Sequence, residues 1–298
     1  MRKERNDENR ESSESREAFL KKAGLITTGG MALGALGSLS PALATTRDNM
    51  RTKPLKGKVA MVTGAARNMG RGFAVLLGSY GADVLVHYHR ARSRAEAASV
   101  AKEIERAGSK AAIVSGDISK VAAVKKLYDK AEREFGRIDI VVNNAGALVK
   151  KPIVQVTPEE FDRVFGINAK GTFFSMREAA RRIKNNGRII NITTSILTGS
   201  TPMYSAYVGS KASVEYFTRA LSKELAKKKV TVNNVAPGPI DTDFFHRAET
   251  ARSLAYIKKY IGIGKVDDVV PAVGFLALPE AGWINGQTIF VNGGYATR

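Results

Sequence analysis

Beyond residue 57 the chain alternates between short apolar, β-branched runs and longer stretches whose apolar residues recur at helical spacing. Strands that are apolar throughout are buried on both faces, which is typical of parallel sheets covered by helices. The pattern therefore predicts an α/β fold with a doubly wound, seven-stranded parallel sheet and helices on both faces. The predicted strands span residues 59–63, 83–87, 111–114, 138–143, 187–193, 230–235 and 288–291.

The helical stretches fall between these strands. They predict helices that begin near Gly70, Arg94, Ser119, Pro158, Met203 and Val266. No internal repeat and no long linker interrupts this part of the chain. Because α/β domains often reach about 250 residues, we expect residues 51–298 to form a single domain.

Residues 1–50 follow a different pattern. Residues 1–22 carry seven basic and six acidic side chains and almost nothing apolar, so they cannot build a core. Residues 23–44 carry no charge, but they are too short and too rich in glycine for a convincing membrane span. We therefore expect no stable membrane insertion of the domain that follows.

The same segment resembles an export signal. Lys21 and Lys22 supply a positive flank, and Ala42-Leu43-Ala44 resembles a signal-peptidase site. Residues 15–21 resemble a twin-arginine signal in which Glu17 stands in place of the second arginine. We expect a cleaved or disordered segment and a periplasmic protein. The alternatives are an uncleaved anchor or a vestigial tail, with a cytoplasmic protein.

Composition narrows the chemistry. The chain has no cysteine, which excludes thiolate metal sites, iron–sulfur clusters and cysteine nucleophiles. Its three histidines (His87, His89 and His246) lack ligand spacing near a carboxylate cluster, so no metal site is predicted. A formal net charge of +19 is compatible with binding to nucleic acid, to an anionic membrane or to an anionic cofactor or substrate, and also with a basic surface that has no such partner. Because the basic residues are scattered, we expect no nucleic-acid partner.

A glycine-bearing turn follows the first predicted strand and precedes a helix. In such a unit the first glycine permits the tight turn, and the last lets a pyrophosphate approach the amides at the helix N-terminus. The context predicts a Rossmann-type dinucleotide site. Its predicted cofactor-binding residues are Gly64, Arg67, Asn68, Met69 and Gly70.

Four motifs resemble those of the short-chain dehydrogenase/reductase family, and the resemblance covers residues 57–298. They are T-G-x-x-x-G-x-G at 63–70 with Asn68 for the middle glycine, N-N-A-G at 143–146, Y-x-x-x-K at 207–211 and P-G-x-x-x-T at 237–242. The resemblance implies an adenine contact from Asp117 with Ile118. It also implies cofactor contacts from Asn144, Ala145, Gly146, Pro237, Gly238, Ile240 and Thr242.

The end of the second strand indicates which dinucleotide binds. Enzymes that use NAD usually place an acid there for the ribose hydroxyls, whereas a 2′-phosphate needs cations and donors. This chain has no acid until Glu96, and its run His87-Tyr88-His89-Arg90 resembles that of pteridine reductases. We therefore predict NADP(H), with NAD(H) as the alternative. The predicted phosphate contacts are Arg67, His89, Arg90 and Ser93.

Tyr207 and Lys211 are four residues apart and project from one face of a predicted helix. A lysine cation beside a phenol, together with the cofactor's nicotinamide, stabilises the tyrosinate and lowers its pKa from about 10. Tyr207 can then protonate a carbonyl oxygen during reduction, or deprotonate an alcohol in reverse. Lys211 is also expected to hold the nicotinamide ribose.

A hydroxyl near the end of the fifth strand is expected to bind the substrate oxygen. Both Thr194 and Ser195 stand at suitable spacing from Tyr207. We favour Ser195, because its unbranched side chain is less confined, and keep Thr194 as the alternative. Asn168 matches the family's helix asparagine, which implies that it anchors a water that relays protons to Lys211.

The sequence also offers indications about the substrate and the oligomeric state. Residues 243–261 occupy the place of the family's variable substrate lid, and their aromatic residues can clamp a ring-bearing carbonyl or simply pack a helix. We predict an NADPH-dependent oxidoreductase that reduces a ketone or aldehyde, with a 3-oxoacyl compound among the candidates. The alternative is a non-catalytic NADP-binding sensor or scaffold. The resemblance also implies a homotetramer.

Overall fold

The computed structural model describes residues 53–199 and 201–297. The predicted signal-like segment at residues 1–50 lies outside the described residues. The described chain contains seven strands that form one sheet in the order β3-β2-β1-β4-β5-β6-β7, and every pairing is parallel. The strands are β1 Val59–Val62, β2 Asp83–Tyr88, β3 Ala111–Ser115, β4 Ile140–Asn143, β5 Arg188–Ile192, β6 Thr231–Pro237 and β7 Thr288–Val291. The predicted fold class is confirmed.

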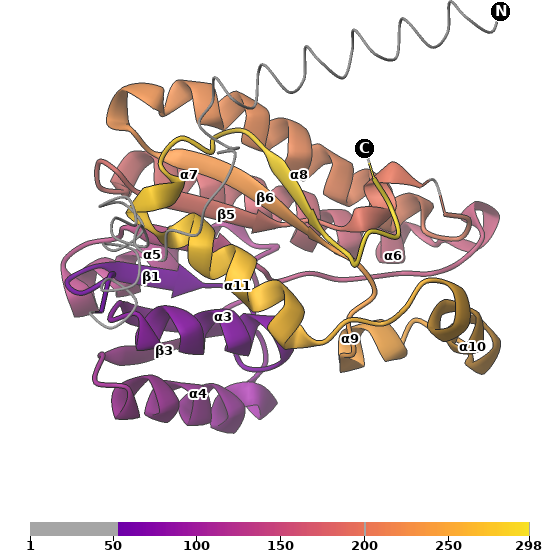
Figure 1. Ribbon diagram of the computed structural model, residues 1–298, viewed down its shortest axis with the longest axis horizontal. Coiled ribbons are helices and arrows are strands. Elements are labelled where there is room, and N and C mark those ends of the chain that lie inside the picture. The colour runs from indigo at the N-terminus through magenta and orange to yellow at the C-terminus, as the bar shows by residue number, and fades with distance from the viewer. Residues whose placement is uncertain (1–52, 200, 298) are drawn as a thin grey trace, which may run out of the picture. The chain divides into compact units, whose positions relative to one another are not determined.

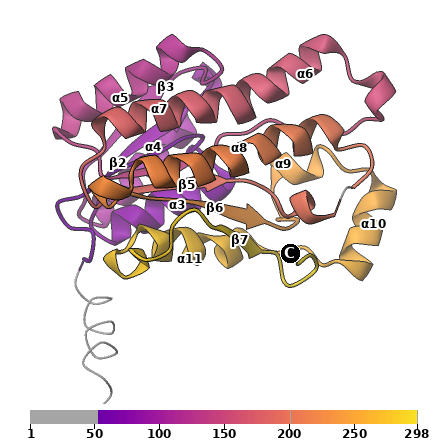
Figure 2. The ribbon, with the colours of Figure 1, turned by 90° about the horizontal axis from the view of Figure 1, so that it is seen from above.

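Helices cover both faces of this sheet (Figures 1 and 2). One layer comprises α3 (Asn68–Ser79), α4 (Arg94–Arg106) and α11 (Val266–Ala277). The opposite layer comprises α5 (Val121–Phe135), α6 (Pro158–Phe165), α7 (Thr172–Arg182) and α8 (Ser205–Glu224). Two short helices, α9 (Asp243–His246) and α10 (Ala251–Tyr260), lie beyond the carboxyl ends of the strands (Figure 1).

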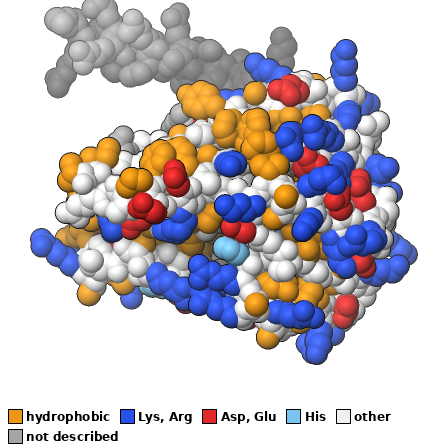
Figure 3. Space-filling view, turned by 180° about the vertical axis from the view of Figure 1, so that it is seen from behind, with side chains coloured by type: hydrophobic (Ala, Val, Ile, Leu, Met, Phe, Trp, Pro, Cys, Tyr) orange, Lys and Arg blue, Asp and Glu red, His pale blue; other side chains and the backbone are white. Residues whose placement is uncertain are grey.

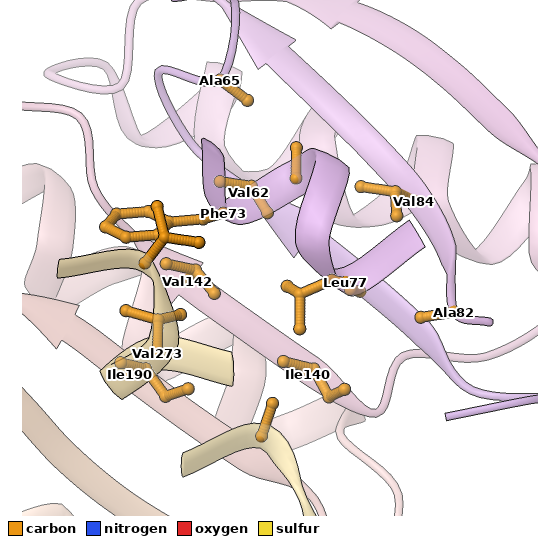
Figure 4. Packing of buried hydrophobic residues seen from close by; sticks show 14 of the residues in the cluster. Val62, Ala65, Phe73, Leu77, Ala82, Val84, Ile140, Val142, Ile190 and Val273 are labelled. Atoms are coloured by element: carbon orange, nitrogen blue, oxygen red, sulfur yellow. The ribbon is translucent and has the colours of Figure 1, made fainter. Parts of the chain in front are cut away.

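Separate apolar clusters join each helical layer to the sheet. In the α3–α11 layer, Phe73 and Leu77 pack with Val273 over strand residues that include Val142 and Ile190 (Figure 4). Both Phe73 and Leu77 have no exposed surface. Burying a side chain of this size contributes about 1.5–3 kcal/mol, so α3, which follows the glycine-bearing turn, is held firmly against the sheet.

A π-helical segment, Gly166–Gly171, joins α6 to α7. A capping box at Thr157 and Glu160 starts α6, and no local sequence signal marks the change of helical register directly after Phe165. Such π segments often occur at functional sites, since the extra residue redirects side chains. Here Asn168 lies in the segment and is completely buried.

The surface is basic. Lys and Arg side chains are spread over the face drawn in Figure 3, with Asp and Glu side chains among them. Within the described residues, no helix combines the length and apolar character needed to cross a membrane. Across residues 53–199 and 201–297, His, Asp and Glu form no cluster of three that could hold a metal ion.

Candidate active site

A large pocket opens along the carboxyl edge of the sheet, with a volume of about 1440 Å³. It lies at the carboxyl ends of β1 and β4, where the strand order changes direction: from β1 the chain continues to β2 on one side, and β4 lies on the other side of β1. Parallel sheets of this kind bind ligands at such a point. Every residue predicted above to bind the cofactor lines this pocket, as does Thr194. Asn168 and Ser195 do not line it.

The turn after β1 leaves no room for side chains at its two glycines. Gly64 has φ +64°, and a Cβ atom on Gly70 would lie 2.2 Å from the Gly64 carbonyl oxygen. Asn68, at the position of the missing glycine, has φ +52°. Asparagine tolerates this left-handed conformation better than other residues with a side chain. The substitution therefore keeps the turn geometry that a dinucleotide site needs.

The N-N-A-G run is fastened to the same turn. The Asn144 and Ala145 amides donate to the Thr63 hydroxyl at 2.9 and 3.1 Å. The Asn144 side-chain amide donates to the Thr63 and Gly64 carbonyls at 2.9 and 3.2 Å. Thr63 is thus a functional residue that motif reasoning did not single out, because its role depends on a strand 80 residues further along the chain.

His87 also holds this turn, and the sequence reasoning did not assign it a role. The Gly64 amide donates to His87 Nδ1 at 3.1 Å, and Nε2 lies 2.9 Å from the Gly116 carbonyl oxygen. This pattern requires a neutral imidazole with its proton on Nε2. Burial lowers the pKa of His87 to about 4, so the ring stays neutral above that pH. The imidazole therefore joins the phosphate turn to the loop after β3.

Cationic and donor side chains gather at the end of β2. Arg67, His89 and Arg90 are exposed at the pocket rim, and Ser93 is half-buried beside them. Arg92 and Lys120 line the same region and were not predicted. This donor set suits a phosphate and leaves no carboxylate at the position where NAD enzymes place one.

Asp117 begins the loop after β3. The Ser119 amide donates to its carboxylate at 3.0 Å. Partial burial acts to raise the pKa of Asp117, but the hydrogen bonds from Ser119 outweigh it and hold that pKa below its usual range. Asp117 is therefore an ionised acceptor at the pocket wall, as an adenine contact requires.

Tyr207 and Lys211 lie one turn apart on α8, and both side chains are buried. Burial raises the pKa of Tyr207 to about 12, while the contact with Thr194 acts to lower it. Burial lowers the pKa of Lys211 to about 8. The protein groups alone raise the tyrosine pKa, because the Lys211 ammonium donates to the Ile192 carbonyl at 2.6 Å and the phenol is desolvated. The predicted lowering, which depends on Lys211 together with a bound nicotinamide, stays a prediction.

The two candidate hydroxyls have different positions. Ser195 has no exposed surface, and its hydroxyl donates to the Ala236 carbonyl at 2.7 Å. Thr194 lines the pocket, and its hydroxyl contacts the Tyr207 phenol. The preference for Ser195 is therefore corrected: spacing along the chain did not reveal that Ser195, the first residue of a short 3₁₀ helix after β5, is buried in the core while Thr194 lies against Tyr207.

Asn168 lies behind the pocket wall. Its side chain donates to the Ala147 carbonyl at 2.8 Å and to the Ser210 hydroxyl at 2.9 Å, and it accepts from the Ala147 amide at 2.8 Å. These bonds hold the backbone next to Gly146 against α8. The proton relay to Lys211 through a water, implied by the family resemblance, stays a prediction.

The loop after β6 borders the same pocket. Thr242 caps α9 by accepting from the Phe245 amide at 3.3 Å, and its hydroxyl donates to the Ile240 carbonyl at 3.2 Å. From this loop the chain runs into residues 243–261, which we call the lid. Its Phe244, Phe245 and Tyr256 side chains line the pocket.

The site and the sheet that carries it are typical of a dinucleotide-dependent oxidoreductase. Comparison with known proteins leads to the same class. A family model described as enoyl-(acyl carrier protein) reductase, one of the short-chain dehydrogenase models, matches residues 64–296. A short-chain type dehydrogenase/reductase of Picea abies is 42% identical over 251 residues, covering 80% of this chain and 93% of that protein. The chain belongs to the short-chain dehydrogenase/reductase family and is an NAD(P)-dependent oxidoreductase.

Other similar proteins extend the comparison. A hydroxynaphthalene reductase-like protein of Metarhizium robertsii is 39% identical over 261 residues, covering 82% of this chain and 97% of that protein. A crystal structure described as a dehydrogenase from Burkholderia cenocepacia with bound NADP is 40% identical, with a TM-score of 0.81, over 85% of this chain and 99% of that one. An angucycline C-6 ketoreductase with bound NADP is 34% identical, with a TM-score of 0.76, over 81% and 96% of the two chains.

Proposed function

We propose that this protein is an NADPH-dependent reductase that converts a ring-bearing ketone to an alcohol. One observation carries the proposal: Tyr207 and Thr194 meet in the same pocket that holds the dinucleotide turn, with Lys211 one helical turn away. A proton donor and an oxygen-binding hydroxyl are thus placed beside a cofactor site. That combination serves carbonyl reduction.

The residues present fit NADPH. Gly64 and Gly70 carry no side chain, so their backbone is accessible to a ligand. A Cβ atom at Gly70 would collide with the Gly64 carbonyl oxygen in the same turn. The cations at the end of β2 suit a 2′-phosphate, and the solved relatives that carry NADP in their descriptions support this choice. NADH is the weaker alternative. When bound, NADPH supplies the hydride.

The chain's own residues handle the proton. With its pKa raised to about 12, Tyr207 carries its proton at neutral pH and can give it to the carbonyl oxygen as that oxygen becomes negative. Thr194 can donate a second hydrogen bond to the same oxygen. Lys211, with a pKa near 8, can return a proton toward Tyr207 after turnover. All three side chains have little exposed surface, which limits their contact with bulk water during the transfer.

The aromatic side chains of the lid favour a substrate that carries a ring. Phe244, Phe245 and Tyr256 present aromatic surface to the pocket, and Tyr295 adds another ring from the C-terminal segment. The relatives include proteins described as a hydroxynaphthalene reductase-like protein and an angucycline ketoreductase. Both descriptions name fused-ring chemistry, which favours an aromatic ketone over a 3-oxoacyl chain.

The test is a panel of ketones assayed through the loss of nicotinamide absorbance, with NADPH and NADH in parallel. We expect NADPH consumption with fused-ring ketones and a higher kcat/KM with NADPH than with NADH. If NADPH binds but no carbonyl compound is reduced, the protein is the non-catalytic sensor or scaffold instead.

We also propose that the chain forms a homotetramer. Large apolar side chains are exposed on the outer helices, including Phe161 on α6, Phe173 on α7 and Tyr216 on α8. Exposed apolar surface of this kind favours self-association. Native mass spectrometry is expected to show four copies, and a monomer at micromolar concentration would contradict the proposal.

A further inference from the structure

Three segments far apart in the sequence meet at the substrate end of the pocket through one buried carboxylate. Glu249 lies in the lid between α9 and α10, and its side chain has no exposed surface. It accepts hydrogen bonds from the Lys150 ammonium, in the loop after β4, and from the Tyr204 phenol, at the start of α8. We call these three residues the latch.

The latch is well isolated from solvent. The Lys150 side chain is 14% exposed, and its ammonium lies 5.2 Å from the centre of the Tyr204 ring. Burial acts to raise the pKa of Glu249, but its bonds with Lys150, Ser253 and Tyr204 outweigh this and hold the pKa below its usual range. The carboxylate is therefore ionised, and removing it would leave a buried ammonium and a buried phenol without their partner.

Tyr204 connects the latch to the reacting group. It stands three residues before Tyr207, and the two ring centres are 6.3 Å apart. The Lys151 amide also donates to the Met203 carbonyl at 2.8 Å, so the loop after β4 and the start of α8 are already joined by backbone. Through its bonds with Lys150 and Tyr204, Glu249 connects the lid to the loop after β4 and to the start of α8.

We propose that Glu249 is a positioning residue that fastens the lid to the catalytic helix and so holds the ketone against Tyr207. This inference rests on the proposed reductase function. The lid carries its pocket-lining aromatic residues on both sides of Glu249, Phe244 and Phe245 before it and Tyr256 after it. A fixed lid gives these rings a defined distance from Tyr207, which matters most for a substrate large enough to touch them.

The test uses Glu249→Gln, which keeps the side-chain size and an acceptor but removes the charge. Tyr204→Phe removes the phenol donor. The matched control is Glu134→Gln, which removes an ion pair to Lys130 of 2.5 Å on the outer face of α5, away from the pocket. Kinetics are measured with 1-tetralone as the fused-ring ketone and 3-pentanone as the small one, and NADPH affinity is measured by fluorescence titration.

For Glu249→Gln we expect KM for 1-tetralone to rise about tenfold, because loss of ground-state binding appears in KM. KM for 3-pentanone, kcat and NADPH affinity are expected to change less than about threefold, as the latch does not touch the cofactor turn. Tyr204→Phe shifts KM in the same direction. The control matches the wild type.

Limited trypsin digestion gives a readout that needs no turnover. The lid contains four cleavage sites, Arg247, Arg252, Lys258 and Lys259. We expect the lid to be cut several-fold faster in Glu249→Gln than in the wild type or the control, when each protein is digested well below its own melting temperature. If the wild type reduces no ketone, the reductase proposal fails while this result still supports the latch. Unchanged cleavage, or faster cleavage throughout the chain with weaker NADPH binding, would overturn it.

Discussion

The sharpest prediction separates Thr194 from Ser195, two adjacent hydroxyls that the structure gives different roles. Thr194→Val preserves the shape of the side chain and removes only the hydroxyl. That hydroxyl contacts the Tyr207 phenol, and among residues 53–199 and 201–297 it otherwise accepts only from the Ile196 amide at 3.4 Å. Its loss is therefore expected to affect the reaction much more than the free energy of unfolding.

The magnitudes follow from these contacts. Removing a donor aimed at a developing oxyanion costs about 2.7–4 kcal/mol, so kcat should fall by roughly 10²–10³ in Thr194→Val. Ser195→Ala deletes a 2.7 Å bond in a completely buried position and leaves the Ala236 carbonyl without this donor. That change costs about 1–3 kcal/mol of unfolding free energy.

The assay is steady-state ketone reduction together with urea unfolding of the same preparations. Thr194→Val is expected to keep its unfolding midpoint and lose turnover, whereas Ser195→Ala loses stability and keeps turnover within about tenfold. The opposite result, with Ser195→Ala inactive and Thr194→Val active, would refute the assignment of Thr194 as the substrate-binding hydroxyl.

Three further predictions concern cofactor binding, acid stability and export. Gly70→Ala places a methyl group 2.2 Å from the Gly64 carbonyl and should abolish NADPH binding in a fluorescence titration, whereas Gly199→Ala, with open space around it and a negative φ, should not. The pKa of His87 is about 4 in the folded protein and 6.5 in the unfolded chain, so the neutral ring contributes fully to the free energy of unfolding above pH 6.5. About 3 kcal/mol of this contribution is lost as the pH falls toward 4. His87→Asn should therefore reduce the slope of the unfolding free energy against pH over that range, and an unchanged slope would contradict this. If residues 1–50 are an export signal, cell fractionation and N-terminal sequencing should find a periplasmic protein that begins near Thr45, and full-length protein in the cytosol would argue against export.

The fold could be predicted from the sequence because its signals are local. Apolar β-branched runs mark strands such as β4, and the glycine turn at Gly64 fixes where the first helix begins. The motifs then place Tyr207 and Lys211 on one helix face. These features depend on residues close together in the chain, so periodicity and spacing reveal them.

The rest of the site depends on contacts between distant segments. The sequence shows His87 only as the last residue of a predicted strand, and its contacts with Gly64 and Gly116 appear only in the folded protein. Nothing in the sequence pairs Glu249 with Tyr204, because the lid reaches α8 only through tertiary packing. The raised pKa of Tyr207 could not be predicted either, since burial is a property of the packed protein and not of the Y-x-x-x-K spacing.

The central claim is that Tyr207 is the proton donor of a carbonyl reductase. Tyr207→Phe removes one oxygen and its proton while keeping the ring that packs near Tyr204. We predict that this variant binds NADPH with the wild-type affinity and that ketone turnover falls by roughly 10²–10⁴, the usual contribution of a positioned acid. Turnover at the wild-type rate would contradict the account.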